Sequence, residues 1–95
     1  MSLRFEWDPK KAKTNQTKHD ISFEEALTVF ADPLARIFPD EEHSADEFRE
    51  IIIGYSARHQ LILVNFTGID NQVRIFSARK ATRRERKDYE ENVGS

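Results

Sequence analysis

Apolar residues along this chain recur with two spacings, and each spacing predicts one kind of element. Phe23, Ala26, Leu27 and Phe30 stand at i, i+3, i+4 and i+7, which places them on one face of a helix that covers a core. Later in the chain, short runs rich in Ile, Val, Leu and Phe alternate with small groups of polar residues, as strands and turns do. The pattern therefore predicts a fold that combines helices with a sheet.

Three helices are predicted from their start signals. An Asp-Pro pair at residues 8–9 places an N-cap before a proline at the first helical position, and opens a helix that reaches residue 18. A Ser-x-x-Glu capping box at residues 22–25 precedes the apolar stripe of the second helix. A Thr-x-x-Glu capping box at residues 82–85 opens the last helix, which ends near residue 91.

Five short strands are predicted around these helices, and brief turns connect the last three. Such turns join antiparallel neighbours. The order β-α-α-β-β-β-β-α favours an α+β fold, with an antiparallel sheet of four to five strands and helices packed on one face. The other face is then available for a site, and the length of 95 residues fits a single domain. The predicted strands cover residues 3–7, 34–38, 49–56, 60–66 and 73–79.

The formal net charge is only −2, but the charges are unevenly distributed. Residues 40–50, predicted to form a turn or loop after the second strand, carry six acids, whereas residues 74–87 carry seven bases and one acid. Residues 10–18 add four lysines. A separated basic surface attracts polyanions even when the total charge is near zero.

The chain has no Cys, no recognisable signal peptide and no apolar run long enough to cross a bilayer, so we expect a cytoplasmic protein without disulfides or membrane contact.

One face of the first predicted helix carries chemically useful groups. Lys11, Asn15, Lys18 and His19 stand at i, i+4, i+7 and i+8, so helical geometry brings them to the same side. Two ammonium groups, an amide and an imidazole can hold a phosphate and transfer a proton near neutral pH. The alternative is an ordinary solvated face with a histidine at the helix end.

Basic residues in the second half of the chain are candidates for phosphate contacts. The planar guanidinium group matches phosphate geometry, and a helix N-terminus offers free N–H groups to the same ligand. Ordinary surface ion pairing is the alternative for the last helix. The candidates are Arg49, Arg74, Arg79, Lys80, Arg83 and Arg86.

Two aromatic residues each have two interpretations. Trp7 is the sole Trp and is more often a core residue, although it can also stack on a base. Tyr89 either closes the edge of the core with its hydroxyl in water, or stacks on a base. The sequence has no strong metal-binding motif, because His19, His43 and His59 lack HxxxH spacing and Cys partners. The acids beside His43 would make at most a weak accidental site, so the sequence predicts neither a metal nor a cofactor.

Two segments of the chain resemble the BrnT toxin family. The first covers residues 5–33, FEWDPKKAKTNQTKHDISFEEALTVFADP, and the second covers residues 73–91, VRIFSARKATRRERKDYEE, whose RI-SARKAT-RE-Y pattern is the more specific. The chain departs from the family at Asp20, where glycine is usual, and at Phe76, which replaces an aliphatic residue. Asp tolerates the left-handed conformation that a helix end often needs, so we expect that turn to form.

The resemblance implies a RelE-like fold and a ribonuclease toxin of a type II toxin–antitoxin pair. It implies an RNA substrate and a BrnA-like DNA-binding antitoxin that forms a heterotetramer with the toxin. This toxin–antitoxin complex would repress its own operon. The reaction implied is metal-independent cleavage of RNA by an endoribonuclease: the substrate's 2′-hydroxyl attacks the adjacent phosphorus and leaves a 2′,3′-cyclic phosphate and a 5′-hydroxyl.

Within this interpretation we expect catalytic roles for His19, Lys18, Arg79, Arg83 and Tyr89. His19 would act as acid or base with lysine assistance, the two arginines would hold the phosphate, and Tyr89 would position a base or donate a proton. Cations from both ends of the chain would then converge on one hollow. The alternative function is a non-catalytic binding module that uses its basic surface for nucleic acid or an acidic protein. The expected RNA-binding residues are Lys11, Asn15, Arg49, Arg74, Lys80, Arg86 and Trp7.

Overall fold

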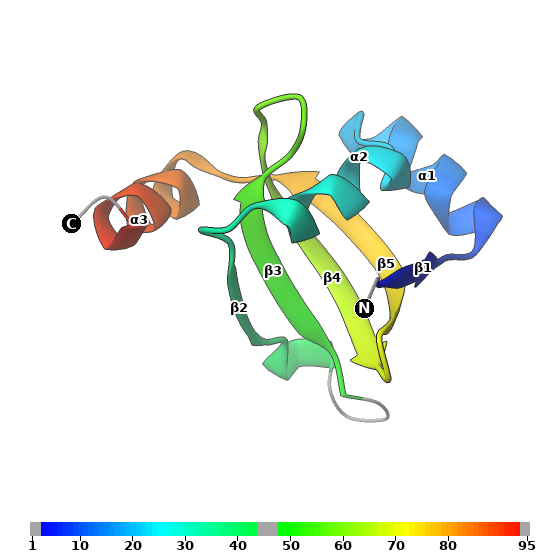
Figure 1. Ribbon diagram of the computed structural model, residues 1–95. Coiled ribbons are helices and arrows are strands. Elements are labelled where there is room, and N and C mark those ends of the chain that lie inside the picture. The colour runs from blue at the N-terminus through cyan, green and yellow to red at the C-terminus, as the bar shows by residue number, and fades with distance from the viewer. Residues whose placement is uncertain (1–2, 44–47, 94–95) are drawn as a thin grey trace.

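Five strands form one sheet at the centre of the computed structural model, which describes residues 3–43 and 48–93 (Figure 1). The predicted order β-α-α-β-β-β-β-α is confirmed. Part of the acidic segment, residues 44–47, lies outside the described residues, as does the side chain of His43. In chain order the elements are β1 (Arg4–Glu6), α1 (Pro9–His19), α2 (Phe23–Thr28), β2 (Arg36–Pro39), β3 (Glu50–Tyr55), β4 (Leu61–Ile69), β5 (Gln72–Lys80) and α3 (Arg83–Val93), with 3₁₀ turns at Val29–Ala31 and Glu41–His43.

The strands lie side by side in the order β1-β5-β4-β3-β2. The pairs from β2 to β5 are antiparallel, as the short turns predict. β1 instead runs parallel to β5, with Phe5 opposite Val73, so the prediction of a wholly antiparallel sheet is wrong. A parallel neighbour needs a long crossover connection, and the helices and strands between β1 and β5 supply one.

The ends of the first two helices follow the predicted cap chemistry, with one exception. Asp8 accepts a backbone N–H of the first turn of α1 at 2.9 Å, and Ser22 accepts the N–H of Glu25 at 3.0 Å. Asp20 ends α1 with φ 56°, in the left-handed region, as expected for a residue that stands where the family has glycine. The Glu25 carboxylate does not complete a capping box. It is buried and accepts the Ser56 hydroxyl at 2.7 Å, which ties α2 to the β3–β4 turn.

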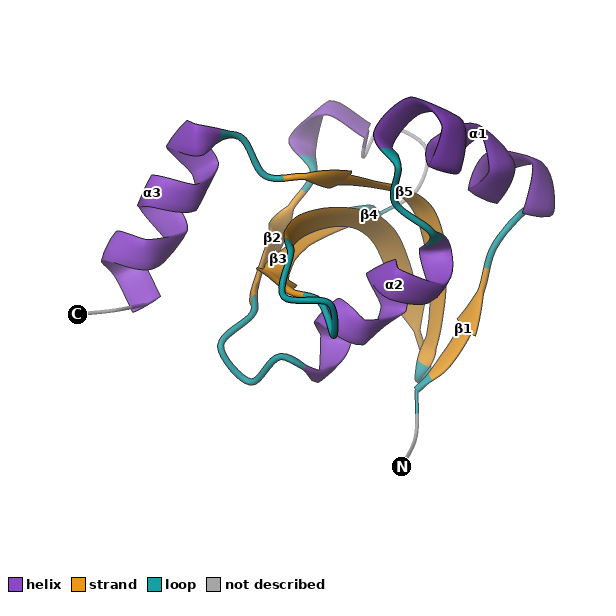
Figure 2. Cartoon of the chain, turned by 90° about the horizontal axis from the view of Figure 1, so that it is seen from above, coloured by secondary structure: helices purple, strands orange, loops and turns teal. Residues whose placement is uncertain are grey.

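α2 covers one face of the sheet, and α1 lies along the β5 edge with Ala12 packed against the same core (Figures 1 and 2). Residues of α2 and its flanks are completely buried against β3, β4 and β5, and edge-to-face aromatic pairs extend this core to the sheet edge. Trp7 joins it, with its ring 5.8 Å from Phe23, so the core interpretation of this Trp is favoured. The fully buried core residues include Ile21, Phe23, Ala26, Val29, Ile62 and Val64.

α3 lies apart from the other helices, at the opposite end of the molecule from α1 (Figures 1 and 2). Its Tyr89 packs against Ile53, Leu61 and Leu63, which form a second, smaller core on the other face of the sheet. The prediction that the helices share one face is therefore wrong for α3. Those apolar side chains of β3 and β4 alternate away from the first core and need their own cover.

Candidate functional site

A β-bulge in β5 sets the geometry of the candidate site. Asn65 of β4 pairs with Ser77, while the next residue, Phe66, pairs with Ile75, so Phe76 is an extra residue in β5. Strict alternation would place Arg74 and Arg79 on opposite faces, because five positions separate them. The bulge shifts the alternation by one residue, and so directs both arginines to the face opposite the first core. Phe76 and Ser77 face the same side.

A groove of about 270 Å³ lies between α1 and this bulge. It brings together the predicted cations of α1, Lys11, Lys18 and His19, which are all exposed. Lys18 and His19 lie in the last turn of α1, where the helix dipole favours positive charge. The shared face that helical spacing predicted is therefore present. The groove is lined by Lys10, Lys11, Thr14, Asn15, Lys18, His19, Phe76 and Ser77.

Phe76 connects cations from two separate segments at this groove. The guanidinium carbon of Arg49, which precedes β3, lies 4.0 Å from the centre of the Phe76 ring. The ammonium nitrogen of Lys11 lies 5.3 Å from the same centre. Both distances are within the range of cation–π attraction. Lys11 and Arg49, two of the predicted RNA-binding residues, are thus brought together around one aromatic ring.

Asn15 lies in the same groove but is part of the framework. β1 pairs only with the first residues of β5, so α1 covers the rest of that sheet edge. The Asn15 carboxamide accepts the N–H of Ala78 at 3.0 Å and donates to the carbonyl of Ile21 at 2.9 Å. Because Asn15 is only 5% exposed, we leave it out of the RNA-contacting set and assign it the docking of α1 on β5.

A buried carboxylate, Asp40, holds a chain of side-chain hydrogen bonds that ends at the groove. Asp40 accepts the side-chain N–H of Asn65 at 2.7 Å, and the Asn65 carbonyl accepts the Ser77 hydroxyl at 3.1 Å. Asp40 is 4% exposed, so this chain of hydrogen bonds is largely shielded from water. It orients the Ser77 hydroxyl, which lines the groove.

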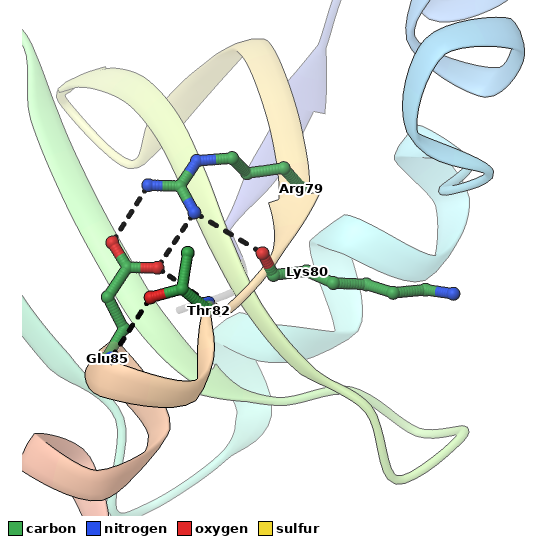
Figure 3. Close-up of polar contacts among 4 residues, drawn as sticks. All are labelled: Arg79, Lys80, Thr82 and Glu85. Carbon is green, nitrogen blue, oxygen red and sulfur yellow. Dashed lines mark hydrogen bonds and ion pairs between the residues drawn. The ribbon is translucent and has the colours of Figure 1, made fainter.

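Arg79 is held by an acid of α3 (Figure 3). Its guanidinium donates to both carboxylate oxygens of Glu85, at 2.8 and 2.9 Å. Glu85 also accepts the N–H of Thr82 at 2.8 Å, and the Thr82 hydroxyl accepts the Glu85 N–H at 3.1 Å, so the predicted capping box is complete. The hydrogen bond from Arg79 lowers the pKa of Glu85 to about 2, and the same bond raises the pKa of Arg79.

The other predicted strand cations, Arg74 and Lys80, do not line the groove. Arg74 is 3.5 Å from Glu6, in an ion pair that is nearly half exposed and contributes little. Lys80 pairs with Ile62, a residue of the first core, so Lys80 points to the opposite face from Arg79. Figure 3 shows its side chain extended away from Glu85.

The structure does not bring the α3 residues to the groove of α1. Arg83 and Arg86 are exposed, and within residues 3–43 and 48–93 their side chains make no hydrogen bond or ion pair. They lie with α3 at the other end of the molecule (Figures 1 and 2). The expected hollow, built from cations of both chain ends, is therefore not formed by α1 and α3 together.

Tyr89 is also separate from the groove. It is 5% exposed, and its hydroxyl lies 3.2 Å from both an Asp32 carboxylate oxygen and the Leu34 carbonyl. Burial, followed by the Asp32 charge, raises the pKa of Tyr89 to about 12. These contacts favour a structural role, in which Tyr89 anchors α3 to the segment before β2.

The described part of the chain offers neither a metal-binding cluster nor a membrane-spanning helix. No three His, Cys, Asp or Glu side chains in this part gather closely enough to share a metal ion. No helix there has the length and apolar character needed to cross a bilayer.

Phe76 and Ser77 are the site residues that sequence reasoning missed. Phe76 looked like a conservative replacement for an aliphatic residue, and Ser77 had no distinguishing neighbour. A signal was present, because the apolar positions Val73 and Ile75 continue at Ala78, an odd interval that alternation does not allow. Such a break in the period of two is what a bulge produces.

Comparison with known proteins identifies the family to which this chain belongs. A family described as ribonuclease toxin, BrnT, of type II toxin-antitoxin system matches residues 7–85. The crystal structure of the Brucella abortus ribonuclease toxin BrnT aligns with a TM-score of 0.66 at 26% identity, over 86% of this chain and 100% of that chain. No curated protein sequence gives a significant match. The chain therefore belongs to the BrnT family of ribonuclease toxins of type II toxin–antitoxin systems.

Proposed function

We propose that this protein is an endoribonuclease that cleaves RNA without a metal ion, and that the groove between α1 and the β5 bulge is its active site. The observation that carries the proposal is the meeting of Lys11 and Arg49 at Phe76, in the groove that His19 also lines. These groups supply what RNA cleavage needs from a protein: positive charge around a phosphate and a side chain that can transfer protons.

The reaction begins at the ribose of the substrate. A base removes the proton of the 2′-hydroxyl, and that oxygen attacks the adjacent phosphorus. The bond from phosphorus to the 5′ oxygen breaks, and the leaving oxygen takes a proton from an acid. The products are a 2′,3′-cyclic phosphate and a 5′-hydroxyl, and no water is consumed. DNA resists because it lacks the attacking hydroxyl.

His19 and the nearby cations each have a role in this proposal. His19 is the acid or base, and its neighbour Lys18 assists it. Lys11 and Arg49 offset the negative charge that accumulates on the phosphate oxygens in the transition state. Arg79 lies two residues beyond Ser77 on the same face of β5, and extends the cationic surface along the strand once its guanidinium exchanges Glu85 for a phosphate.

A partner follows from the family. A type II toxin is paired with an antitoxin, and we propose a BrnA-like DNA-binding antitoxin that forms a heterotetramer with this protein. We also propose a RelE-like fold. Support for both comes from the match to the BrnT family and from the α+β architecture with a sheet face outside the first core. Co-expression of the toxin with its neighbouring reading frame, followed by mass measurement of the complex, tests the partner and its stoichiometry.

The activity test incubates the purified protein with single-stranded RNA in excess EDTA and analyses the 3′ ends of the products. The wild-type protein should cleave and leave cyclic phosphates. His19→Ala should slow cleavage by about 10²-fold or more, as loss of an acid–base residue does. Arg49→Ala should also be slow, whereas Lys13→Ala is the matched control, since Lys13 is exposed on α1 and does not line the groove. Cleavage that stops in EDTA, or equal rates in all variants, would contradict the proposal. RNA that binds but stays intact would instead support the non-catalytic binding module.

A further inference from the structure

The Phe76 side chain has a position that neither core explains. It is half-buried, and it belongs neither to the core beneath α1 and α2 nor to the core beneath Tyr89. The bulge turns it away from the first core and into the groove, where its ring meets Arg49 at 4.0 Å and Lys11 at 5.3 Å. A large aromatic side chain in a groove of cations needs an explanation other than core packing.

Stacking on a ring gives a cation a fixed place. Arg and Lys have long flexible side chains, and holding one of them in a single geometry costs conformational entropy. The face of a guanidinium stacks on the ring, while its N–H donors lie in its plane, so the contact with Phe76 orients those donors without using one. The Arg49 guanidinium is therefore ordered before a phosphate arrives, and less entropy is lost on binding.

We propose that Phe76 is a positioning residue, whose ring holds Arg49 and Lys11 at the groove so that both cations reach the same phosphate of single-stranded RNA. This inference rests on the proposed function, in which the groove binds RNA. It assigns Phe76 to binding through the two cations, with no direct part in proton transfer. Its removal should therefore act mainly on KM, whereas His19 acts on kcat.

The experiment measures binding of a single-stranded 2′-O-methyl RNA oligonucleotide, which cannot be cleaved, by fluorescence anisotropy at several salt concentrations. The variants are Phe76→Leu, which removes the π face but keeps an apolar side chain, and Phe76→Tyr, which keeps the ring. Phe38→Leu is the matched control, because Phe38 is 41% exposed on β2 and does not line the groove. Arg49→Lys keeps the charge, removes the planar stacking group, and gives a second test if Phe76→Leu folds poorly.

We expect Phe76→Leu to weaken binding by about three- to tenfold, the size of an exposed to partly shielded cation–π contact. The slope of log K against log salt should fall by about 0.7 for each phosphate that is no longer neutralised, a readout that a packing defect alone would not change. Phe76→Tyr and Phe38→Leu should bind as the wild type does, and Arg49→Lys should resemble Phe76→Leu. In cleavage of unmodified RNA, Phe76→Leu should raise KM more than it lowers kcat.

The possible results separate the two proposals. If Phe76→Leu keeps the affinity and salt slope of the wild type while the wild type cleaves RNA, the inference about Phe76 is wrong and the ribonuclease function stands. If Phe76→Leu weakens binding but the wild type cleaves nothing, the inference stands and the catalytic proposal is wrong. A wild-type protein that does not bind the oligonucleotide overturns the inference, and so does a Phe76→Tyr variant as weak as Phe76→Leu.

Discussion

The contacts of Glu85 predict a stability change that depends on pH. Its carboxylate accepts two hydrogen bonds from Arg79 and one from the Thr82 N–H (Figure 3). Glu85→Gln removes the charge but keeps an amide oxygen that can accept the Thr82 N–H, because Gln also serves in capping boxes. Glu85→Ala removes the ion pair and the acceptor of the Thr82 N–H together, whereas the Thr82 hydroxyl still caps the backbone N–H of residue 85. The two substitutions therefore separate the electrostatic contribution from the capping contribution.

The magnitude follows from the exposure of the pair. The Arg79 side chain is 41% exposed and the Glu85 side chain 31%, so solvent screens a large part of the attraction. Exposed ion pairs contribute up to about 1 kcal/mol, and the bidentate geometry puts this one near the upper end. We expect Glu85→Gln to lower the free energy of unfolding by about 1 kcal/mol at pH 7. Loss of the hydrogen bond from the Thr82 N–H costs about a further 1 kcal/mol, so Glu85→Ala should lower the free energy of unfolding by about 2 kcal/mol.

The sign of the pH dependence follows from the lowered pKa. Glu85 has a pKa of about 2 in the folded protein, against an ordinary value of 4.5. Between these values the unfolded chain binds the proton more readily, so the contribution is fully present above pH 4.5 and is lost as the pH falls toward 2. Partial burial opposes the ionisation of Asp32, but hydrogen bonds from Tyr55, Leu34 and Tyr89 together lower its pKa. That carboxylate is unchanged in both proteins, so its effect cancels in the difference.

The assay is urea unfolding followed by circular dichroism, at pH 7 and at successively lower pH. The difference between the wild type and Glu85→Gln should be largest at neutral pH and should shrink steadily in acid. A difference of the same size at every pH, or none at pH 7, would refute the reasoning, because it would mean that the ion pair with Arg79 does not stabilise the folded state.

Three further substitutions test contacts that hold the fold together, each by urea unfolding together with RNA cleavage. Tyr89→Phe removes the hydroxyl that binds Asp32 and should lower the free energy of unfolding by about 1 kcal/mol without slowing cleavage; slow cleavage by a stable variant would restore Tyr89 as a catalytic candidate. Asn15→Ala leaves the N–H of Ala78 without its acceptor and should cost about 1–3 kcal/mol, and an unchanged stability would show that α1 docks by other contacts. Gly54→Ala would place a Cβ 2.9 Å from the Cβ of Ala35 and should cost about 1–3 kcal/mol, and an unchanged stability would show that the segment before β2 moves to admit the methyl group.

Local chemistry explains which parts of the fold could be predicted from the sequence. The cap residue Asp8 and the capping box at Thr82 act within four residues of their partners, so both helix starts are correct. The parallel direction of β1 and the place of α3 depend on contacts far apart in the sequence. Tyr89 meets Asp32 across 57 positions, and no short-range pattern reports such a contact.

The same difference between local and long-range contacts applies to the candidate site. Helical spacing correctly brought Lys11 and His19 to one groove. It could not show that Arg49 would reach the same groove by stacking on Phe76, since that contact joins the segment before β3 to the bulge of β5. Nor could charge counting show that Arg79 would be held by Glu85, an acid that stands among seven bases in residues 74–87.

The most direct test of the central claim is an NMR titration that locates RNA on the protein. Amide and arginine side-chain signals of the labelled protein are followed as the 2′-O-methyl RNA oligonucleotide is added. We predict that the largest shifts occur at Lys11, His19, Arg49, Phe76 and Ser77. Shifts confined to α3, with the signals of α1 and the β5 bulge unchanged, would contradict the claim that this groove binds the ribose-phosphate backbone.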